Sequence, residues 1–307
     1  MQSLLDVPAP AKLNLFLHVL GRRPDGYHLL QSAFVLIDWC DTLHFEKRSD
    51  GQLNRHDLGS PLPQDDLCLR AARALQTASN TSWGCDISIA KQLPSGAGLG
   101  GGSSDAATTL LALNRLWSLN WSRSQLQKLA LPLGADVPFF VAGDNALAEG
   151  VGELLRPLLL PEHRLAVVKP PCEVPTRVIF NSPHLVRDNQ AAILSGFLAS
   201  TDVLFQGFGR NDLQAVAEAE FPQVAQAVQL LHQLFGNSRM TGSGSAVFSV
   251  LDTPPEASAA GKKKLDEGAD TAARAAQAML SGVLPANWTA RVCRSLPQHP
   301  LSGWAAD

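Results

Sequence analysis

The sequence predicts an α+β fold with two domains, and three observations support this prediction. Strand and helix patterns are mixed along the chain, without the regular alternation of single strands and helices that a doubly wound sheet requires. The chain has 307 residues, 45% hydrophobic and 17% charged, a globular balance that can bury a sizeable core. The composition shifts around residues 158–163. We therefore place the two predicted domains at 1–158 and 159–307.

The first predicted elements are strands. Between residues 11 and 19, aliphatic residues alternate with a second set that includes Lys12 and Asn14, and this period of two predicts a half-buried strand. A Pro-Asp-Gly turn follows at 24–26, and a further strand is predicted at 29–45. The polar stretch 48–63, which contains Gly and Pro, predicts a hairpin or a loop.

Helices follow from apolar spacings of three and four. One helix is predicted directly after the glycines that end at residue 102, with Ser103 or Ser104 as its N-cap and Asp105 complementing its dipole. The other predicted elements are strands at 86–90, 164–169 and 246–251, helices at 67–78, 122–130, 211–219 and 222–235, and a helix with a loose insertion in the Ala-rich stretch 252–277.

The most informative segment is the glycine-rich stretch 93–104, in which five glycines fall within seven positions. Glycine permits positive φ and lets another group approach the main chain closely. The stretch lies between a strand pattern and a helix pattern, so its N–H groups and the positive end of the helix would converge. It predicts a phosphate-binding loop.

Several known phosphate loops do not fit this stretch. Gly96-x-Gly98-x-x-Gly101 has the letters of the dinucleotide fingerprint, but no Asp or Glu occurs between Asp105 and Asp136 to hold a ribose. A P-loop needs Lys-Ser or Lys-Thr after the glycines, and a protein kinase needs His-Arg-Asp and Asp-Phe-Gly elements, none of which occurs. The glycine-rich ATP loop of another kinase type remains, with a flexible linker as the structural alternative.

Charge and cysteine content argue against other function classes. The net charge is −3 and no basic stripe is present, which speaks against a nucleic-acid partner. No apolar run reaches the roughly 18 residues of a membrane span, and residues 1–8 lack a signal-peptide pattern. The five cysteines are scattered, and none forms a Cys-x-x-Cys pair, which predicts reduced thiols and a cytoplasmic location.

Five segments together resemble the GHMP kinases. They are Pro-Ala-Pro-Ala-Lys-Leu-Asn at 8–14, Asp-Gly-Tyr-His at 25–28, the glycine-rich stretch 93–104, Leu-Gly-Ala-Asp-Val-Pro at 133–138, and Arg-Met-Thr-Gly-Ser-Gly-Ser at 239–245. The glycine-rich stretch alone indicates only the superfamily. The first two segments narrow the resemblance to a member that acts on a cytidylated polyol.

The resemblance implies a two-domain GHMP kinase fold, with a ribosomal S5 domain 2-like N-terminal half and a ferredoxin-like C-terminal half. It implies ATP and Mg²⁺, and phosphorylation of the C2 hydroxyl of 4-diphosphocytidyl-2-C-methyl-D-erythritol in the non-mevalonate route to isoprenoids. ATP would lie over Pro94, Ser95, Gly96, Ala97, Gly98, Leu99, Gly100, Gly101, Gly102, Ser103 and Ser104.

The resemblance also implies catalytic roles. Asp136 would accept the proton of the substrate hydroxyl, and Lys12 beside it would offset charge on the transferring phosphoryl group. Asn14 would orient the hydroxyl or the lysine. The structural alternatives are an N-cap role for Asp136 at the short helix near Pro138 and a solvated strand face for Lys12. Magnesium ligands are not assigned, although Ser103, Ser104 and Asp136 are candidates.

For substrate binding, the resemblance implies that Tyr27 and Phe180 stack on the two faces of cytosine while His28 hydrogen-bonds the base edge. Core packing of Phe180 and a structural role for His28 are the alternatives. The residues that would lie near the phosphates or the polyol, unless they form a simple turn into a strand, are Gly242, Ser243 and Gly244. Asp66 departs from the family, which usually has Asn at this position near the adenine pocket.

Three other functions remain open at this stage. A homoserine or mevalonate kinase would share the glycine loop but would have no use for a cytosine clamp around Tyr27. An NAD-linked oxidoreductase lacks the acidic residue after the glycines. An RNA-binding domain of the S5-like fold conflicts with the net charge of −3. The sequence assigns neither an oligomeric state nor a role to the stretch 252–277.

Overall fold

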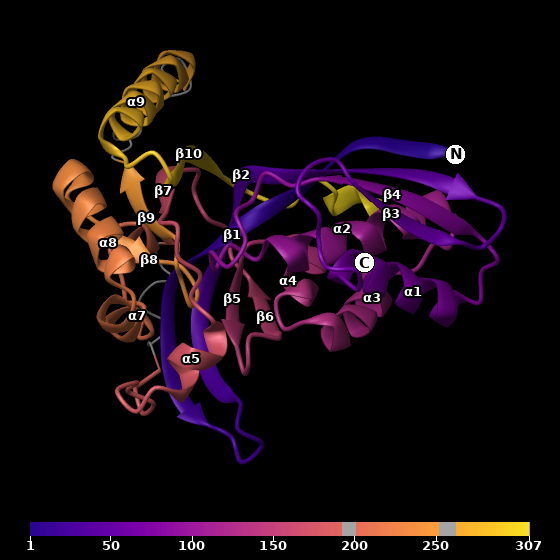
Figure 1. The fold of residues 1–307 in the computed structure, drawn as a ribbon, viewed down its shortest axis with the longest axis horizontal. Coiled ribbons are helices and arrows are strands. Elements are labelled where there is room, and N and C mark those ends of the chain that lie inside the picture. The colour runs from indigo at the N-terminus through magenta and orange to yellow at the C-terminus, as the bar shows by residue number, and fades with distance from the viewer. Residues whose placement is uncertain (192–200, 252–261, 307) are drawn as a thin grey trace.

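A long β-hairpin forms the centre of the molecule (Figure 1). The computed structural model describes residues 1–191, 201–251 and 262–306. In the hairpin, β1 (Ser3–Arg22) pairs antiparallel with β2 (His28–Arg48) from Ser3↔Glu46 to Arg22↔His28, and irregularities in the register bend both strands. One irregularity lies at Pro10, which fits a bulge because proline cannot donate to a regular ladder.

The sheet joins the two parts of the chain through β2. The strand order is β3-β4-β2-β10-β7-β9-β8, and β1 and β5 also pair with β2. The bounds are β3 (Leu53–Asp57), β4 (Gly84–Ala90), β5 (Ala146–Glu149), β6 (Leu154–Pro157), β7 (Arg164–Lys169), β8 (Arg239–Met240), β9 (Val247–Leu251) and β10 (Thr289–Leu296). The final long strand, β10, therefore lies between the N-terminal strand β2 and the C-terminal strand β7.

The helices gather in two groups at opposite ends of this sheet (Figure 1). The N-terminal group is α1 (Leu67–Ser79), α2 (Gly101–Leu116), α3 (Arg123–Ala130) and α4 (Val137–Ala142). The C-terminal helices are α5 (Thr176–Asn181), α7 (Gln214–Glu220), α8 (Pro222–Phe235) and α9 (Lys262–Val283). None of the helices within the described residues combines the length and apolar character that a membrane crossing requires.

Three buried apolar clusters hold these parts together. One packs α1, α2 and α4 against β2 and β4, and another packs α7 and α8 against β7 and β9. The third joins the hairpin to both halves, because Leu13 of β1, Leu99 of the glycine-rich stretch and Val167 of β7 all belong to it. β6 ends at Pro157 and β7 begins at Arg164. The domain division at residue 158 stays a prediction.

Most of the predicted elements are present. The helix predictions at 67–78, 122–130, 211–219 and 222–235 correspond to α1, α3, α7 and α8, and the strand predictions at 29–45, 86–90, 164–169 and 246–251 correspond to β2, β4, β7 and β9. The stretch 252–277 includes the first part of α9, whereas 252–261 lies outside the described residues.

Three local predictions are wrong. The strand predicted at 11–19 is part of the longer β1, and its Lys12 face is buried instead of solvated. The stretch 48–63 contains β3, which pairs parallel with β4 and so is not half of a local hairpin. The N-cap of α2 is Gly100 rather than Ser103 or Ser104, because Gly100, with φ of 73°, enters the helix from the left-handed region without a side-chain cap.

Candidate functional site

The glycine-rich stretch 93–104 runs from β4 into α2 and lies against the second glycine segment, 241–245. The N–H groups of Ser245 and Ala246 donate to the carbonyls of Gly96 (3.2 Å) and Ala97 (3.0 Å). Gly98 has φ of 74°, and a Cβ there would lie 2.3 Å from the Thr241 carbonyl oxygen. Glycine is required at this position because any side chain would push the two segments apart.

This loop forms a wall between two cavities. The cavity on one side, which we call the central cavity, has a volume of about 220 Å³ and is lined by Lys12, Asn14, Asp136 and residues of both glycine segments. The cavity on the other side, which we call the loop cavity, has a volume of about 460 Å³ and is lined by 93–103, 62–63, 65–68, Lys91 and Asp105. Gly96, Gly98 and Gly100 line both cavities. A phosphate chain lying along the loop could therefore reach a group bound on its other side.

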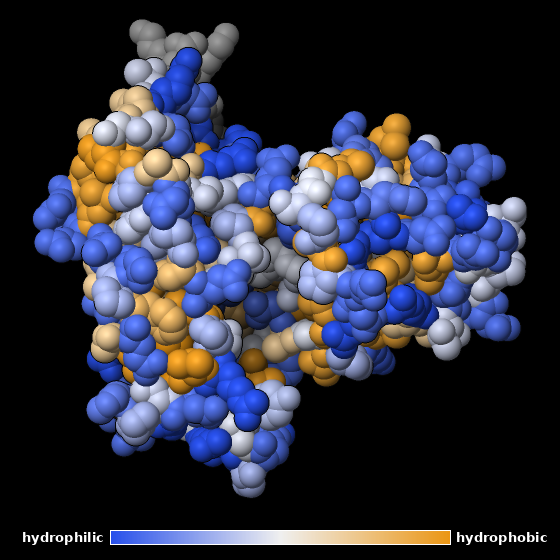
Figure 2. All heavy atoms as spheres, viewed as in Figure 1, coloured by the Kyte–Doolittle hydropathy of each residue, from blue (hydrophilic) through white to orange (hydrophobic). Residues whose placement is uncertain are grey.

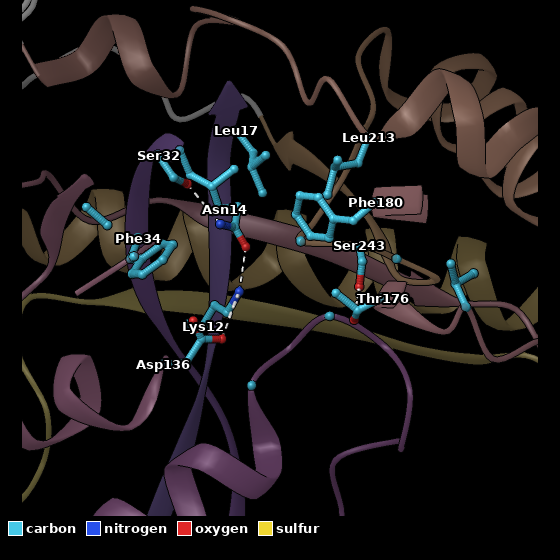
Figure 3. Close-up of a pocket in the computed structure, with 18 of the residues that line it drawn as sticks. Lys12, Asn14, Leu17, Ser32, Phe34, Asp136, Thr176, Phe180, Leu213 and Ser243 are labelled. Carbon is cyan, nitrogen blue, oxygen red and sulfur yellow. Dashed lines mark hydrogen bonds and ion pairs between the residues drawn. The ribbon is translucent and has the colours of Figure 1, made fainter. Parts of the chain in front are cut away.

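Three polar side chains meet on the floor of the central cavity (Figure 3). The ammonium of Lys12 donates to Oδ1 of Asn14 at 2.5 Å and lies 3.6 Å from Oδ2 of Asp136. The side chain of Lys12 is only 5% exposed, whereas that of Asp136 is 32% exposed. Asn14 thus holds the Lys12 ammonium in place, and the Asp136 carboxylate stays open to a molecule in the cavity.

Asn14 ties this cluster to the C-terminal half. Its backbone N–H donates to Oγ1 of Thr241 at 2.9 Å, and its side-chain amide donates to Oγ of Ser32 at 2.8 Å. Asn14 and Lys12 are both buried as whole residues. The idea that Lys12 lies on a solvated strand face is therefore wrong, because β1 is covered on both faces.

Asp136 stands at the N-cap position of α4, but its side chain makes no capping hydrogen bond. Its φ and ψ of −85° and −15° are helical, whereas a capping side chain normally belongs to a residue with extended φ and ψ. Pro138 follows in the first turn and has no N–H to be capped. The geometry therefore leaves the carboxylate free for Lys12 and for the cavity.

A buried charge cluster that the sequence did not reveal lies beside the loop. The ammonium of Lys91 contacts Asp41 and lies 2.5 Å from Oδ2 of Asp105. Asp41 also accepts the backbone N–H groups of Gln92 (2.5 Å) and Leu93 (2.8 Å). Burial raises the pKa of Asp105 to about 8, although the nearby Lys91 opposes this shift. The cluster anchors the start of the loop, and Asp105 is buried rather than complementing the helix dipole.

Of the three residues expected around cytosine, His28 and Phe180 stack on each other, and Tyr27 is exposed. Tyr27, at the hairpin tip, is 66% exposed. The imidazole of His28 stacks on the Phe180 ring, with centroids 4.8 Å apart and an interplanar angle of 29°. Phe180 lines the central cavity. The faces of Tyr27 and the free face of Phe180 are therefore the surfaces on which a base could stack, and the predicted sandwich stays a prediction.

The other predicted positions also lie at the two cavities. Gly242, Ser243 and Gly244 line the central cavity, and the Ser243 hydroxyl is 2.8 Å from that of Thr176 on α5. Pro94 to Ser103 line the loop cavity, whereas Ser104 is fully buried and is not among the lining residues of either cavity.

Asp66 also lines the loop cavity, where it serves the fold in two ways. Its carboxylate accepts the N–H of Leu69 at 3.0 Å as the N-cap of α1, and it lies 3.1 Å from a guanidinium nitrogen of Arg55. Oδ1 of Asp66 is thus already engaged by two groups of the protein. A contact between this position and adenine stays an expectation.

The residues near the loop are compatible with a magnesium ion held mainly by phosphate. Mg²⁺ usually takes one or two protein oxygens and completes its shell with phosphates and water. Ser103 lines the loop cavity. Its hydroxyl also lies close to Gly134, two residues before Asp136, because a Cβ added to Gly134 would be 3.8 Å from the Ser103 Oγ. Among the described residues, no group of three or more His, Cys, Asp or Glu side chains forms a metal cage.

Comparison with known proteins agrees with this geometry. Residues 66–144 match the family model of the GHMP kinase N-terminal domain, and residues 191–267 match that of the GHMP kinase C-terminal domain. A homoserine kinase from Cytophaga hutchinsonii shares the fold, with a TM-score of 0.63 at 16% identity over 97% of this chain and 96% of its own. The fold and the glycine-loop site thus define a kinase of the GHMP class, which uses ATP. The NAD-linked and RNA-binding alternatives are therefore wrong.

Relatives with higher sequence identity identify one family within the GHMP kinases. The 4-diphosphocytidyl-2-C-methyl-D-erythritol kinase of Methylibium petroleiphilum is 56% identical over 305 residues, 99% of both chains, and that of Paracidovorax citrulli is 51% identical over 311 residues. A crystal structure of 4-(cytidine 5'-diphospho)-2C-methyl-D-erythritol kinase has a TM-score of 0.73 at 35% identity and covers 94% of this chain and 98% of its own. The chain belongs to the 4-diphosphocytidyl-2-C-methyl-D-erythritol kinase family.

Proposed function

We propose that this chain transfers the γ-phosphoryl group of ATP to the C2 hydroxyl of 4-diphosphocytidyl-2-C-methyl-D-erythritol, in the non-mevalonate route to isoprenoids. The names of its relatives support this substrate. The single observation that carries the proposal is the loop wall: the glycines lie between the loop cavity and a central cavity that holds Lys12 and Asp136. ATP would occupy the loop cavity and the acceptor alcohol the central one.

The chemistry follows from the two charged side chains. The exposed carboxylate of Asp136 accepts the proton of the C2 hydroxyl as its oxygen attacks the γ-phosphorus, and the bond from that phosphorus to the bridging oxygen of ADP breaks. Lys12, 3.6 Å from Asp136, offsets negative charge on the phosphoryl oxygens. Asn14 holds the Lys12 ammonium through its 2.5 Å hydrogen bond. Bound Mg²⁺ would neutralise charge on the phosphates, and Ser103, which lines the loop cavity, is a candidate to hold it.

The experiment that tests this proposal is a coupled ADP-release assay with purified protein, ATP and Mg²⁺. We expect ADP release with the cytidylated methylerythritol and at most background release with homoserine or mevalonate. Removal of Mg²⁺ with a chelator should abolish the reaction, because the phosphate charges would then be unscreened. Turnover of homoserine or mevalonate without turnover of the cytidylated substrate would show that the substrate is assigned wrongly.

A variant of Tyr27 tests the cytosine site separately. Since one stacking partner of a base contributes roughly 1–3 kcal/mol, Tyr27→Ala should weaken binding of the cytidylated substrate by about 5- to 150-fold. Tyr27→Phe, the matched control, should be mild because the ring face is kept. ATP affinity should hardly change, because the exposed Tyr27 is not among the residues that line the loop cavity.

Calorimetric titration of the substrate and of a non-hydrolysable ATP analogue into the three proteins measures both affinities. An equal loss for both ligands in Tyr27→Ala would mean that the ring is structural. Unchanged affinities would remove Tyr27 from the base site.

A further inference from the structure

Arg187, which the sequence did not single out, connects the segment after α5 to His28. Its Nε–H donates to Nε2 of His28 at 3.1 Å. Its other guanidinium nitrogens donate to the carbonyls of Leu185 (2.9 Å), Phe180 (2.8 Å) and Ser182 (2.7 Å). Four hydrogen bonds thus fix this guanidinium, and the bond to His28 is the only one of the four that reaches β2.

This contact determines which ring nitrogen of His28 carries the proton. A guanidinium has only donors, so Nε2 of His28 must accept, and a ring nitrogen that accepts has no proton. A neutral imidazole carries its one proton on the other nitrogen, here Nδ1. Burial, Arg187 and Arg22 all lower the pKa of His28, which favours this neutral form.

The fixed donor belongs to a ring that stacks on a residue of the central cavity. Phe180 stacks on a face of the His28 ring and Arg187 contacts its Nε2, which leaves the Nδ1 side of the ring edge. Among the described residues, Nδ1 of His28 has no hydrogen-bond partner, and Phe180 itself lines the central cavity. His28 is 7% exposed as a residue, so this donor keeps limited access to solvent, and a ligand with an acceptor at that point would give it a partner.

We propose that Arg187 is a positioning residue that fixes the tautomer of His28, and that this tautomer makes the base site select cytosine over uracil. The inference rests on the proposed function, because it takes the base of the cytidylated substrate to lie at His28. Ring nitrogen N3 of cytosine is an acceptor and pairs with the Nδ1–H donor. The same atom of uracil carries a hydrogen, so two donors would face each other and both would lose a partner.

The test begins with the tautomer of the wild-type chain. In the full-length protein labelled with ¹⁵N-histidine, we expect the His28 signals, assigned by their loss in His28→Gln, to show the proton on Nδ1 and a bare Nε2 at neutral pH. A proton on Nε2, or a doubly protonated ring, would overturn the proposal without any change to Arg187.

The second measurement compares the nucleotides CDP and UDP as probes. We expect the wild type to bind CDP at least about tenfold more tightly than UDP, since bound UDP would press two donors together and take both from water without a partner. Arg187→Met, which keeps the apolar stem, should reduce this preference several-fold and give a mixed tautomer signal. Arg177→Met on α5 is the matched control: Arg177 is exposed, so the same charge is removed, and the preference should persist.

Kinetics separate this inference from the proposed function. For Arg187→Met we expect a raised KM for the cytidylated substrate and a KM for ATP close to that of the wild type, together with a lower thermal midpoint because three backbone carbonyls lose their donor. If the wild type phosphorylates the cytidylated substrate but the variant keeps the full CDP preference, the inference fails and the function stands. If the wild type does not phosphorylate this substrate, the proposed function itself fails.

Discussion

Replacing Asp136 by asparagine is expected to lower kcat for the cytidylated substrate by roughly 10²–10⁴-fold, the usual contribution of a general base. The amide keeps the shape of the carboxylate but cannot accept the proton of the hydroxyl. Asp136→Ala should lose a similar factor. The KM for ATP should change little, because Asp136 lines the central cavity and not the loop cavity.

Steady-state kinetics and a thermal melt together decide this prediction. Asp136 makes no capping hydrogen bond in α4, so the asparagine variant should melt near the wild-type temperature. Asp144→Asn, at an exposed aspartate just after α4, is the control and should keep full activity. A variant of Asp136 that loses stability but keeps most of its kcat would instead assign this residue to the fold.

The second large effect concerns stability. Lys91→Met is expected to lower the free energy of unfolding by about 3–5 kcal/mol above pH 8, where Asp105 is ionised, since breaking a buried ion pair leaves uncompensated charge. The side chains of Asp41 and Asp105 are 0% and 4% exposed and would lose their cation. Urea denaturation of the variant and the wild type measures the loss. Lys128→Met, at an exposed lysine of α3, should stay within about 0.5 kcal/mol of the wild type.

The pH dependence of this cluster has a definite sign. Burial raises the pKa of Asp105 from an ordinary 3.8 to about 8, so the fold favours its neutral form. The stability it contributes is complete below its ordinary pKa and is lost as the pH rises through about 8. Asp105→Asn should remove this loss over the interval from about pH 5 to 8. A wild-type stability that rises over the same interval would contradict the assignment.

Several features could be predicted because their causes are local in sequence. α1 and α8 arise from apolar spacings of three and four, and each has its own start signal, Asp66 as N-cap or Pro222 in the first turn. The glycine-rich loop is predictable because glycine tolerates positive φ, which Gly96, Gly98 and Gly100 adopt. The resemblance of short segments brought Lys12 and Asp136 into one hypothesis, and the structure places them 3.6 Å apart.

Other features depend on contacts between distant residues, and the sequence carries no local signal for them. Lys91 pairs with Asp41 across 50 positions, and Arg187 reaches His28 across 159. Ser103 and Ser104 had the residue type of an N-cap, yet Gly100 took that place because the loop turns into α2 before them. Lys12 looked solvated by its period of two, but β1 is covered on both faces.

The sequence by itself determined the class of fold, the position of the glycine-rich loop, and the residue types proposed for phosphoryl transfer. These depend on side-chain periodicity and on the backbone freedom of glycine, which act over a few residues. Only the tertiary structure decided which polar groups are buried together, which cavity each glycine lines, and which donor fixes the His28 ring. Burial and hydrogen-bond partners arise when distant segments pack, and packing is a property of the whole chain.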